Sequence, residues 1–450
     1  MYALIKQLQN CREFKSLLGA LSGRQVQQQV VGLSGAQRAL LLAGLAESLG
    51  APLLVITSQE GDAAALAEDL SAFLPSRRVL LFPAAQLLPY QVLAHGREVL
   101  AQRLKALVAV LEGESPVVVA PVEALLRRLS PPEVFRRAAV ELSLGQRLEP
   151  RELLGRLVAL GYERVEMVEG PGQVAARGGI VDVYPLNADN PVRVEFFGDE
   201  IDSLRAFDVE SQRSVENVLQ VTIAPARELV VTPEARERAL NVLESEYQMQ
   251  LRKFEGVAYR EARENLRELV RGAQEKIAGE VISPDLALFL PYFYREPYTL
   301  LDYLPATTLV AVDDLVRVRE VAETVNFERS ETYGQLLAAG RVLPGMFHGY
   351  VPWQHVEQQA ARRRAVYLSL LPRQPQGLVV HGVSGFSAKS VPSFMGRPEM
   401  LCEEVRQWRR AGQAVVLLVA GEDRARRLQE ELGEAGIEAG LVTHLEGELS

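Results

Sequence analysis

The sequence predicts an α/β protein with three parts: a parallel, doubly wound sheet domain, an α+β unit inserted into it, and a small C-terminal α/β unit. Three observations lead to this prediction. Between residues 30 and 126, short apolar β-rich runs alternate with helical stretches. Residues 178–208 alternate apolar and polar side chains with a period of two, which is typical of antiparallel strands. Residues 399–437 follow the order helix, strand, helix.

The first domain is expected to begin its sheet at Val30 and Val31, followed by a glycine turn and a helix. Further strands are predicted in the runs PLLVI, RRVLLF and PVVVAP, with helices DAAALAEDLSAFL and EVLAQRLKALVAVLEG between them. A strand that is buried on both faces has such a continuous apolar run, so the sheet should be parallel and covered by helices on both sides.

The proline-rich stretch SPPE, residues 130–133, predicts a break in the alternation of strands and helices, and the sequence pattern changes after it. The segment 148–162 is predicted to be a helix with Pro150 near its start. An antiparallel hairpin or meander should follow, with turns at residues 187–190 (NADN) and 198–199 (GD). Thr232 and Pro233 then predict the beginning of a long helical region. The buried run TTLVAVDD, residues 307–314, is a further strand that could return to the first sheet.

These elements predict four segments in the chain. Residues 1–128 form the first part of the sheet domain, 129–225 the inserted domain, 226–375 the second part of the sheet domain, and 376–450 the small C-terminal unit. A length of 450 residues is consistent with several domains rather than one core.

Composition excludes several classes of function. The net charge of −9 should repel nucleic acid unless basic residues are concentrated locally. No apolar run approaches the roughly 18 residues of a membrane span, so no membrane contact and a cytoplasmic location are expected. Cys11 and Cys402 have no ligand spacing, the five histidines show no metal spacing, and no catalytic constellation is found.

The stretch GLSGAQRA, residues 32–39, has the glycines of a phosphate-binding loop without its functional end. Gly32 and Gly35 lie in the turn. Gln37, Arg38 and Ala39 stand where the motif G-x-x-x-x-G-K-[ST] has its second glycine, its lysine and its metal-binding hydroxyl. An arginine is a longer, planar cation and alanine cannot ligate Mg²⁺, so no hydrolysis is expected from this loop.

The end of the run VAVDD has two interpretations. Asp313 could be the Mg²⁺ ligand at the end of a nucleotidase strand, with Asp314 where a catalytic glutamate usually follows. A buried strand that ends in a solvated turn explains the pattern equally well, and the degenerate loop favours that second interpretation.

The strand PVRVEFF carries a candidate interaction face. Residues 193, 195 and 197 point to the same side of a strand, so Arg193 and Phe197 flank Glu195. Arginine and an exposed aromatic are common residues of interaction hot spots. The alternative is that Phe197 belongs to the core and Arg193 only pairs with Glu195.

Three stretches resemble a known family. Residues 178–214 (GGIVDVYPLNADNPVRVEFFGDEIDSLRAFDVESQRS) are similar to the module shared by the excision-repair protein UvrB and the bacterial transcription-repair coupling factors. The similarity to the coupling factors is closer and extends through residues 82–111 and 116–135, covering roughly residues 30–325. The resemblance implies a P-loop NTPase-like sheet domain with a degenerate loop, and a UvrB-like inserted domain.

The resemblance also implies partners. The inserted domain should bind the repair ATPase UvrA through Arg177, Arg193 and Phe197, with Glu195 and Arg164 as weaker candidates. The chain would be a non-catalytic, N-terminal fragment without cofactor, because ATP is expected only in a translocase module that the sequence lacks. RNA polymerase and double-stranded DNA would be engaged by absent domains, and an absent C-terminal domain would mask the UvrA face.

Two alternative functions stay open at this point. The chain could be a fragment of an ATPase or helicase with weak, Arg38-dependent nucleotide binding. It could also bind damaged DNA as UvrB does, although the aromatic-rich hairpin of UvrB has no counterpart in the stretch LLPYQVLAHGREVL.

Overall fold

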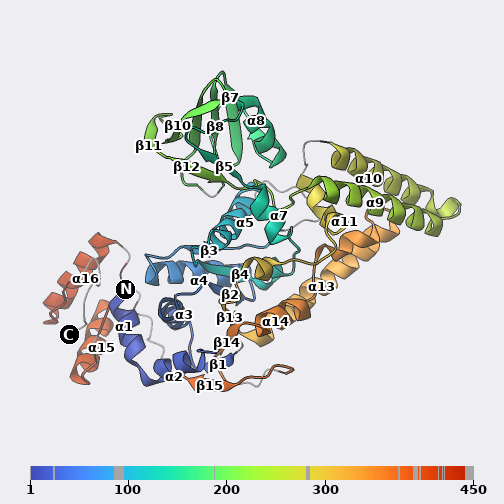
Figure 1. The fold of residues 1–450 in the computed structure, drawn as a ribbon. Coiled ribbons are helices and arrows are strands. Elements are labelled where there is room, and N and C mark those ends of the chain that lie inside the picture. The colour runs from blue at the N-terminus through green and yellow to red at the C-terminus, as the bar shows by residue number, and fades with distance from the viewer. Residues whose placement is uncertain are drawn as a thin grey trace.

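The predicted parallel sheet is present in the computed structural model of the chain (Figure 1). The structure describes residues 2–23, 26–85, 96–186, 188–279, 284–372, 376–388, 394, 397–413, 415–417, 419 and 421–440. Asn187 of the predicted turn lies outside these residues. So does most of the stretch in which the UvrB hairpin was expected to be missing.

The central sheet has the strand order β15-β1-β14-β13-β2-β4-β3, and every pairing in it is parallel. Its strands, in chain order, are β1 (Gln27–Val31), β2 (Leu53–Thr57), β3 (Val79–Leu81), β4 (Val117–Pro121), β13 (Leu309–Asp313), β14 (Arg364–Ser369) and β15 (Gly382–Gly385). Strand β13 pairs with β2 and β14, so the predicted return of TTLVAVDD to the first sheet is confirmed.

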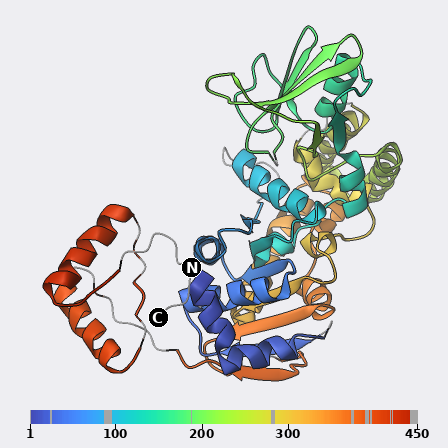
Figure 2. The same ribbon diagram turned by 60° about the vertical axis from the view of Figure 1, so that its left-hand side comes forward.

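Helices cover both faces of this sheet (Figures 1 and 2). One face packs on α1 (Tyr2–Asn10), α2 (Arg12–Ala20), α3 (Ala36–Leu49) and α4 (Glu60–Phe73). The other packs on α5 (Gly96–Leu111), α6 (Val122–Leu125), α12 (Leu300–Tyr303), α13 (Leu315–Ala338) and α14 (Trp353–Ala361). Residues of β2, β4 and β13 alternate between the two clusters, which explains why their sequences are apolar throughout.

The inserted unit follows α7 (Pro132–Ala138) and contains two sheets. Strand β5 (Val140–Ser143) enters it and pairs antiparallel with β12 (Gln220–Ile223), which leaves it. Between them lies a sheet with the order β11-β10-β9-β8-β7-β6. Its strands are β6 (Glu163–Arg164), β7 (Gln173–Arg177), β8 (Ile180–Val183), β9 (Val192–Phe197), β10 (Glu200–Phe207) and β11 (Ser214–Asn217). The predicted antiparallel meander is confirmed in β8, β9 and β10.

The predicted helix at Pro150 is α8 (Pro150–Ala159), and it covers one face of the meander. Leu153 and Leu157 of α8 pack against alternate residues of the strands, such as Val181 and Val194. The residues between these, including Arg193, therefore belong to the opposite face of the sheet.

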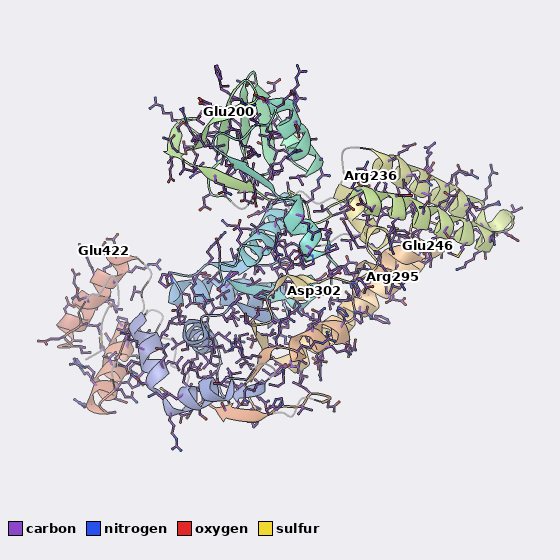
Figure 3. The ribbon with its side chains drawn as sticks, in the orientation of Figure 1. Glu200, Arg236, Glu246, Arg295, Asp302 and Glu422 are labelled. Atoms are coloured by element: carbon purple, nitrogen blue, oxygen red, sulfur yellow. The ribbon has the colours of Figure 1, made fainter. Side chains whose placement is uncertain are left out.

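Two long helices project from the body as an arm (Figure 1). Helix α9 (Pro233–Lys253) begins at Thr232, whose hydroxyl accepts a hydrogen bond from Ala235 N as predicted. Helix α10 (Arg260–Ala278) returns after η1 (Val257–Tyr259). Glu246, labelled in Figure 3, joins α9 to the body because it accepts hydrogen bonds from Tyr292 Oη and, at 2.8 Å, from Gly345 N. The connecting elements are η2 (Pro284–Phe289), α11 (Leu290–Phe293) and η3 (Pro344–Gly349).

The C-terminal part contains the helices α15 (Pro398–Arg410) and α16 (Glu422–Glu434). They pack on each other through a small core that includes Cys402 of α15 and Leu432 of α16. The strand predicted between them is not seen: residues 415–417 and 419, the described part of that run, are not paired in a sheet. The predicted domain boundary at residue 376 stays a prediction; β15 follows it in the chain yet pairs with β1. None of the helices in the described ranges is long and apolar enough to span a membrane.

Candidate interaction face and degenerate nucleotide loop

The candidate face is the side of the six-stranded sheet opposite α8. Antiparallel pairing aligns its residues in rows across the strands. One row contains Asp182, Arg193 and Arg205, and the next contains Arg177, Ile180, Glu195 and Ser203. The structure thus brings the predicted residues Arg177, on β7, and Arg193 and Glu195, both on β9, onto one surface.

Arg193 is held by a residue that the sequence analysis did not single out. Its Nε and Nη2 donate hydrogen bonds of 2.8 Å to the two carboxylate oxygens of Asp182. This bidentate bond raises the pKa of the Arg193 guanidinium. The guanidinium carbon also lies 4.6 Å from the ring centroid of Phe207, a fully buried side chain.

The alternative that Arg193 only pairs with Glu195 is therefore wrong. Glu195 instead accepts a 2.7 Å hydrogen bond from Ser203 Oγ and pairs with Arg205 at 3.2 Å. The reason is cross-strand pairing: a strand neighbour at i+2 is farther away than the residue directly opposite on the next strand. Asp182 and Ser203 are those opposite residues, and they come from β8 and β10.

Phe197 stands at the end of this face, where β9 turns into β10. Its side chain is 83% exposed, so the alternative that it belongs to the core is wrong. Glu200 lies opposite it in the ladder and is labelled in Figure 3. An exposed aromatic side chain can bury a large apolar area when a partner covers it, which suits Phe197 to an interface.

Arg177 and Arg164 complete the predicted set. Arg177 ends β7, is exposed, and donates a 3.0 Å hydrogen bond from Nη2 to the backbone oxygen of Glu166. Arg164 is exposed on β6 at the sheet's edge, beyond β7. It is therefore set apart from the rows that contain Arg193 and Glu195.

A hollow of about 230 Å³ opens on this face. Arg177, Asp182 and Arg193 line it together with the apolar side chains of Met167 and Ile180. Met167 is 46% exposed and Ile180 37% exposed, so the hollow has accessible apolar walls beside its charged groups. Asp182 alternates with two buried valines in β8, and this alternation is the pattern from which its position on this face could have been predicted.

The second candidate region, the degenerate nucleotide loop, connects β1 to α3. Helix α3 begins at Ala36, so Gln37, Arg38 and Ala39 lie in its first turn and only residues 32–35 form the loop. Gly32 has φ +93°, and a Cβ on it would lie 2.2 Å from the backbone oxygen of Phe386. Gly35 also has a positive φ, of +51°. Both positions require glycine for the backbone itself.

Arg38 forms an ion pair with Asp313 at the end of β13. The Asp313 side chain is only 11% exposed, and its burial raises the pKa of the carboxyl while Arg38 opposes that shift. Asp314 has φ +56° and accepts a 3.3 Å hydrogen bond from Arg317 N, which caps α13.

Gln37 and Ala39, at the other two motif positions, make contacts within the chain. Gln37 Oε1 accepts a 3.2 Å hydrogen bond from Ser34 N, and Ala39 is fully buried. In the described ranges of the chain, no group of three or more histidine, cysteine, aspartate or glutamate side chains is arranged to hold a metal ion.

The inserted unit and the chain as a whole are both similar to known proteins. The family model of the UvrB interaction domain matches residues 140–229, which contain the whole candidate face. The transcription-repair-coupling factor of Bacillus subtilis is 33% identical over 430 residues, 96% of this chain and 36% of that protein. Those of Staphylococcus epidermidis and Staphylococcus aureus (strain USA300) are 27% and 25% identical over 94% and 96% of this chain, again 36% of their length.

The chain thus spans about a third of the length of the curated relatives it matches. The resemblance predicted from the sequence is confirmed by these matches together with the match to the UvrB interaction domain. Over nearly its whole length the chain therefore resembles a part of the transcription-repair-coupling factors, and residues 140–229 of it match the UvrB interaction domain.

Proposed function

We propose that the chain is a non-catalytic adaptor that binds UvrA and so recruits nucleotide excision repair to stalled RNA polymerase. The observation that supports this best is the exposed Phe197 on the same side of the sheet as Arg177 and the fixed Arg193, all within the segment that matches the UvrB interaction domain. A rigid sheet that presents an aromatic and two arginines has the residues of a protein-binding hot spot.

In the whole protein, engagement of RNA polymerase and double-stranded DNA would belong to other domains. Masking of this face by a further domain would limit UvrA binding until it is released. A cytoplasmic location stays a prediction from the sequence.

Titration of the purified chain with UvrA in a calorimeter tests the proposal. Truncation of Phe197 to alanine is expected to weaken binding by about 2 kcal/mol or more, roughly thirtyfold, because a large exposed aromatic side chain is a common anchor of protein contacts. Arg177→Ala should also weaken binding. Leu219→Ala is the matched control, since Leu219 is 77% exposed but lies outside the six-stranded sheet. Unchanged binding by both Phe197→Ala and Arg177→Ala would contradict the proposed interface.

We also propose that the chain neither binds Mg-ATP tightly nor hydrolyses it. Arg38 and Asp313 neutralise each other at the place where a nucleotidase would hold phosphate and metal. Calorimetry with Mg-ATP should therefore show no saturable heat at micromolar concentrations. A micromolar dissociation constant that is lost in Arg38→Ala would instead support the weak ATPase alternative.

A further inference from the structure

The Arg193 side chain is held in place by two neighbours, Asp182 and Phe207. Asp182 holds its guanidinium through two parallel hydrogen bonds of 2.8 Å. The face of the guanidinium lies against Phe207, which packs in a small cluster with Val168 and Ala175 on this side of the sheet. The side chains of Arg193 and Asp182 are 22% and 17% exposed, so both are largely shielded from water.

The fixed guanidinium still has donors to offer. A guanidinium carries five N–H groups, and Asp182 takes one from Nε and one from Nη2. Within the described part of the chain, Arg193 makes no further side-chain hydrogen bond. Arg193 lines the hollow beside Ile180, so its remaining N–H groups are accessible from there.

The two arginines of the hollow therefore differ in what they can do. Asp182 neutralises Arg193, so Arg193 offers donors in a fixed geometry rather than a net charge. Arg177 donates to a backbone oxygen, that of Glu166, and forms no ion pair with a carboxylate in the described part of the chain. Pre-organised donors strengthen binding because the side chain loses little rotamer freedom when the partner arrives.

We propose that Asp182 is a positioning residue for the interaction with UvrA: it presents Arg193 to a hydrogen-bond-accepting oxygen of the partner that enters the hollow. This inference rests on the proposed function. It assigns Asp182 a role in binding that acts only through Arg193, so the effect of changing Asp182 should depend on whether Arg193 is present.

A double-mutant cycle tests this dependence. UvrA is titrated against the unchanged chain, Asp182→Asn, Arg193→Ala and the double variant. Asp182→Asn is expected to weaken binding about tenfold in the presence of Arg193, and by less than about twofold in the Arg193→Ala background. Asp182→Glu, which keeps the carboxylate, should recover part of the affinity.

Equal weakening in both backgrounds would overturn the proposal, since a purely structural role of Asp182 does not depend on Arg193. Unchanged affinity of Asp182→Asn, with Phe197→Ala still weakened, would also overturn it while leaving the UvrA interface intact. If Phe197→Ala and Arg177→Ala have no effect either, the proposed function itself fails.

Arg193→Lys keeps the proposal testable if Asp182→Asn does not fold. Lysine retains the positive charge but has no planar fork for Asp182 or for stacking on Phe207. The variant should bind UvrA as weakly as Arg193→Ala. Full affinity of Arg193→Lys would show that fixed geometry is not needed.

Discussion

Glu228→Ala is expected to lower the free energy of unfolding by about 3–5 kcal/mol, because it leaves two buried guanidinium groups without a counter-charge. Glu228 Oε1 accepts a 2.5 Å hydrogen bond from Arg103 Nε, and Oε2 lies 3.4 Å from Arg127 Nη2. Arg103 is fully buried and stacks 3.9 Å from the ring centroid of Phe82. Desolvation would raise the pKa of the Glu228 carboxyl, but the two arginines outweigh it and lower that pKa.

Urea unfolding at neutral pH measures this loss. Glu152→Ala is the matched control: it also removes one carboxylate from an ion pair, with Arg156, but both side chains are about half exposed. That control should change stability by less than about 1 kcal/mol. A loss in Glu228→Ala no larger than in the control would mean that the buried charges find other partners.

Glu228 also connects the inserted unit to the central sheet domain. The residue follows β12, where the chain leaves the inserted unit, and it bonds to α5 beneath the central sheet. The ion pair therefore ties the exit of the inserted unit to the sheet domain. We expect the rest of the inserted unit, with its own core around Leu153 and Val194, to be less affected.

Arg38→Ala should destabilise the chain more at pH 8 than at pH 5. Burial already raises the pKa of Asp313, and removal of the opposing guanidinium raises it further. Because the folded chain then favours the protonated carboxyl, the stability that this group contributes is full below its unfolded pKa of about 3.9 and is lost as the pH rises through the folded value. The expected loss at pH 8 is about 2–3 kcal/mol, since Asp313 is left charged, buried and unpaired.

Urea midpoints of Arg38→Ala and the unchanged chain at several pH values give the measurement. Arg136→Ala serves as control because its ion pair with Glu133 is more than half exposed on both sides. A stability difference for Arg38→Ala that does not change with pH would show that Asp313 is not the group responsible.

The sequence predicted the general features of the fold well. Continuous apolar runs identified β2, β4 and β13, and the period of two identified the meander. Strand β1 was recognised only at Val30 and Val31, because its first residues are glutamines. These are buried by specific partners: Gln27 Oε1, for example, accepts a 2.8 Å hydrogen bond from Tyr367 Oη. A buried polar strand has no signature in the periodicity.

The candidate face was predicted in part. The period of two placed Arg193, Glu195 and Phe197 on one side of β9 without any knowledge of the neighbouring strands. The identity of their partners was beyond this rule, because Asp182 and Ser203 are brought close only by the register between strands. The exposure of Phe197 was also open, since an alternating pattern does not show which of its two faces is covered.

By itself, the sequence determined the class of fold, the loss of the phosphate-binding residues and the family resemblance, because each can be recognised in contiguous stretches of the chain. Only the tertiary structure decided which charges meet. Arg38 reaches Asp313, Glu228 reaches Arg103, and Arg193 reaches Asp182 across strands and helices that the chain order separates. Ion pairs depend on distances of a few ångströms and on burial, and both are set by packing rather than by position along the chain.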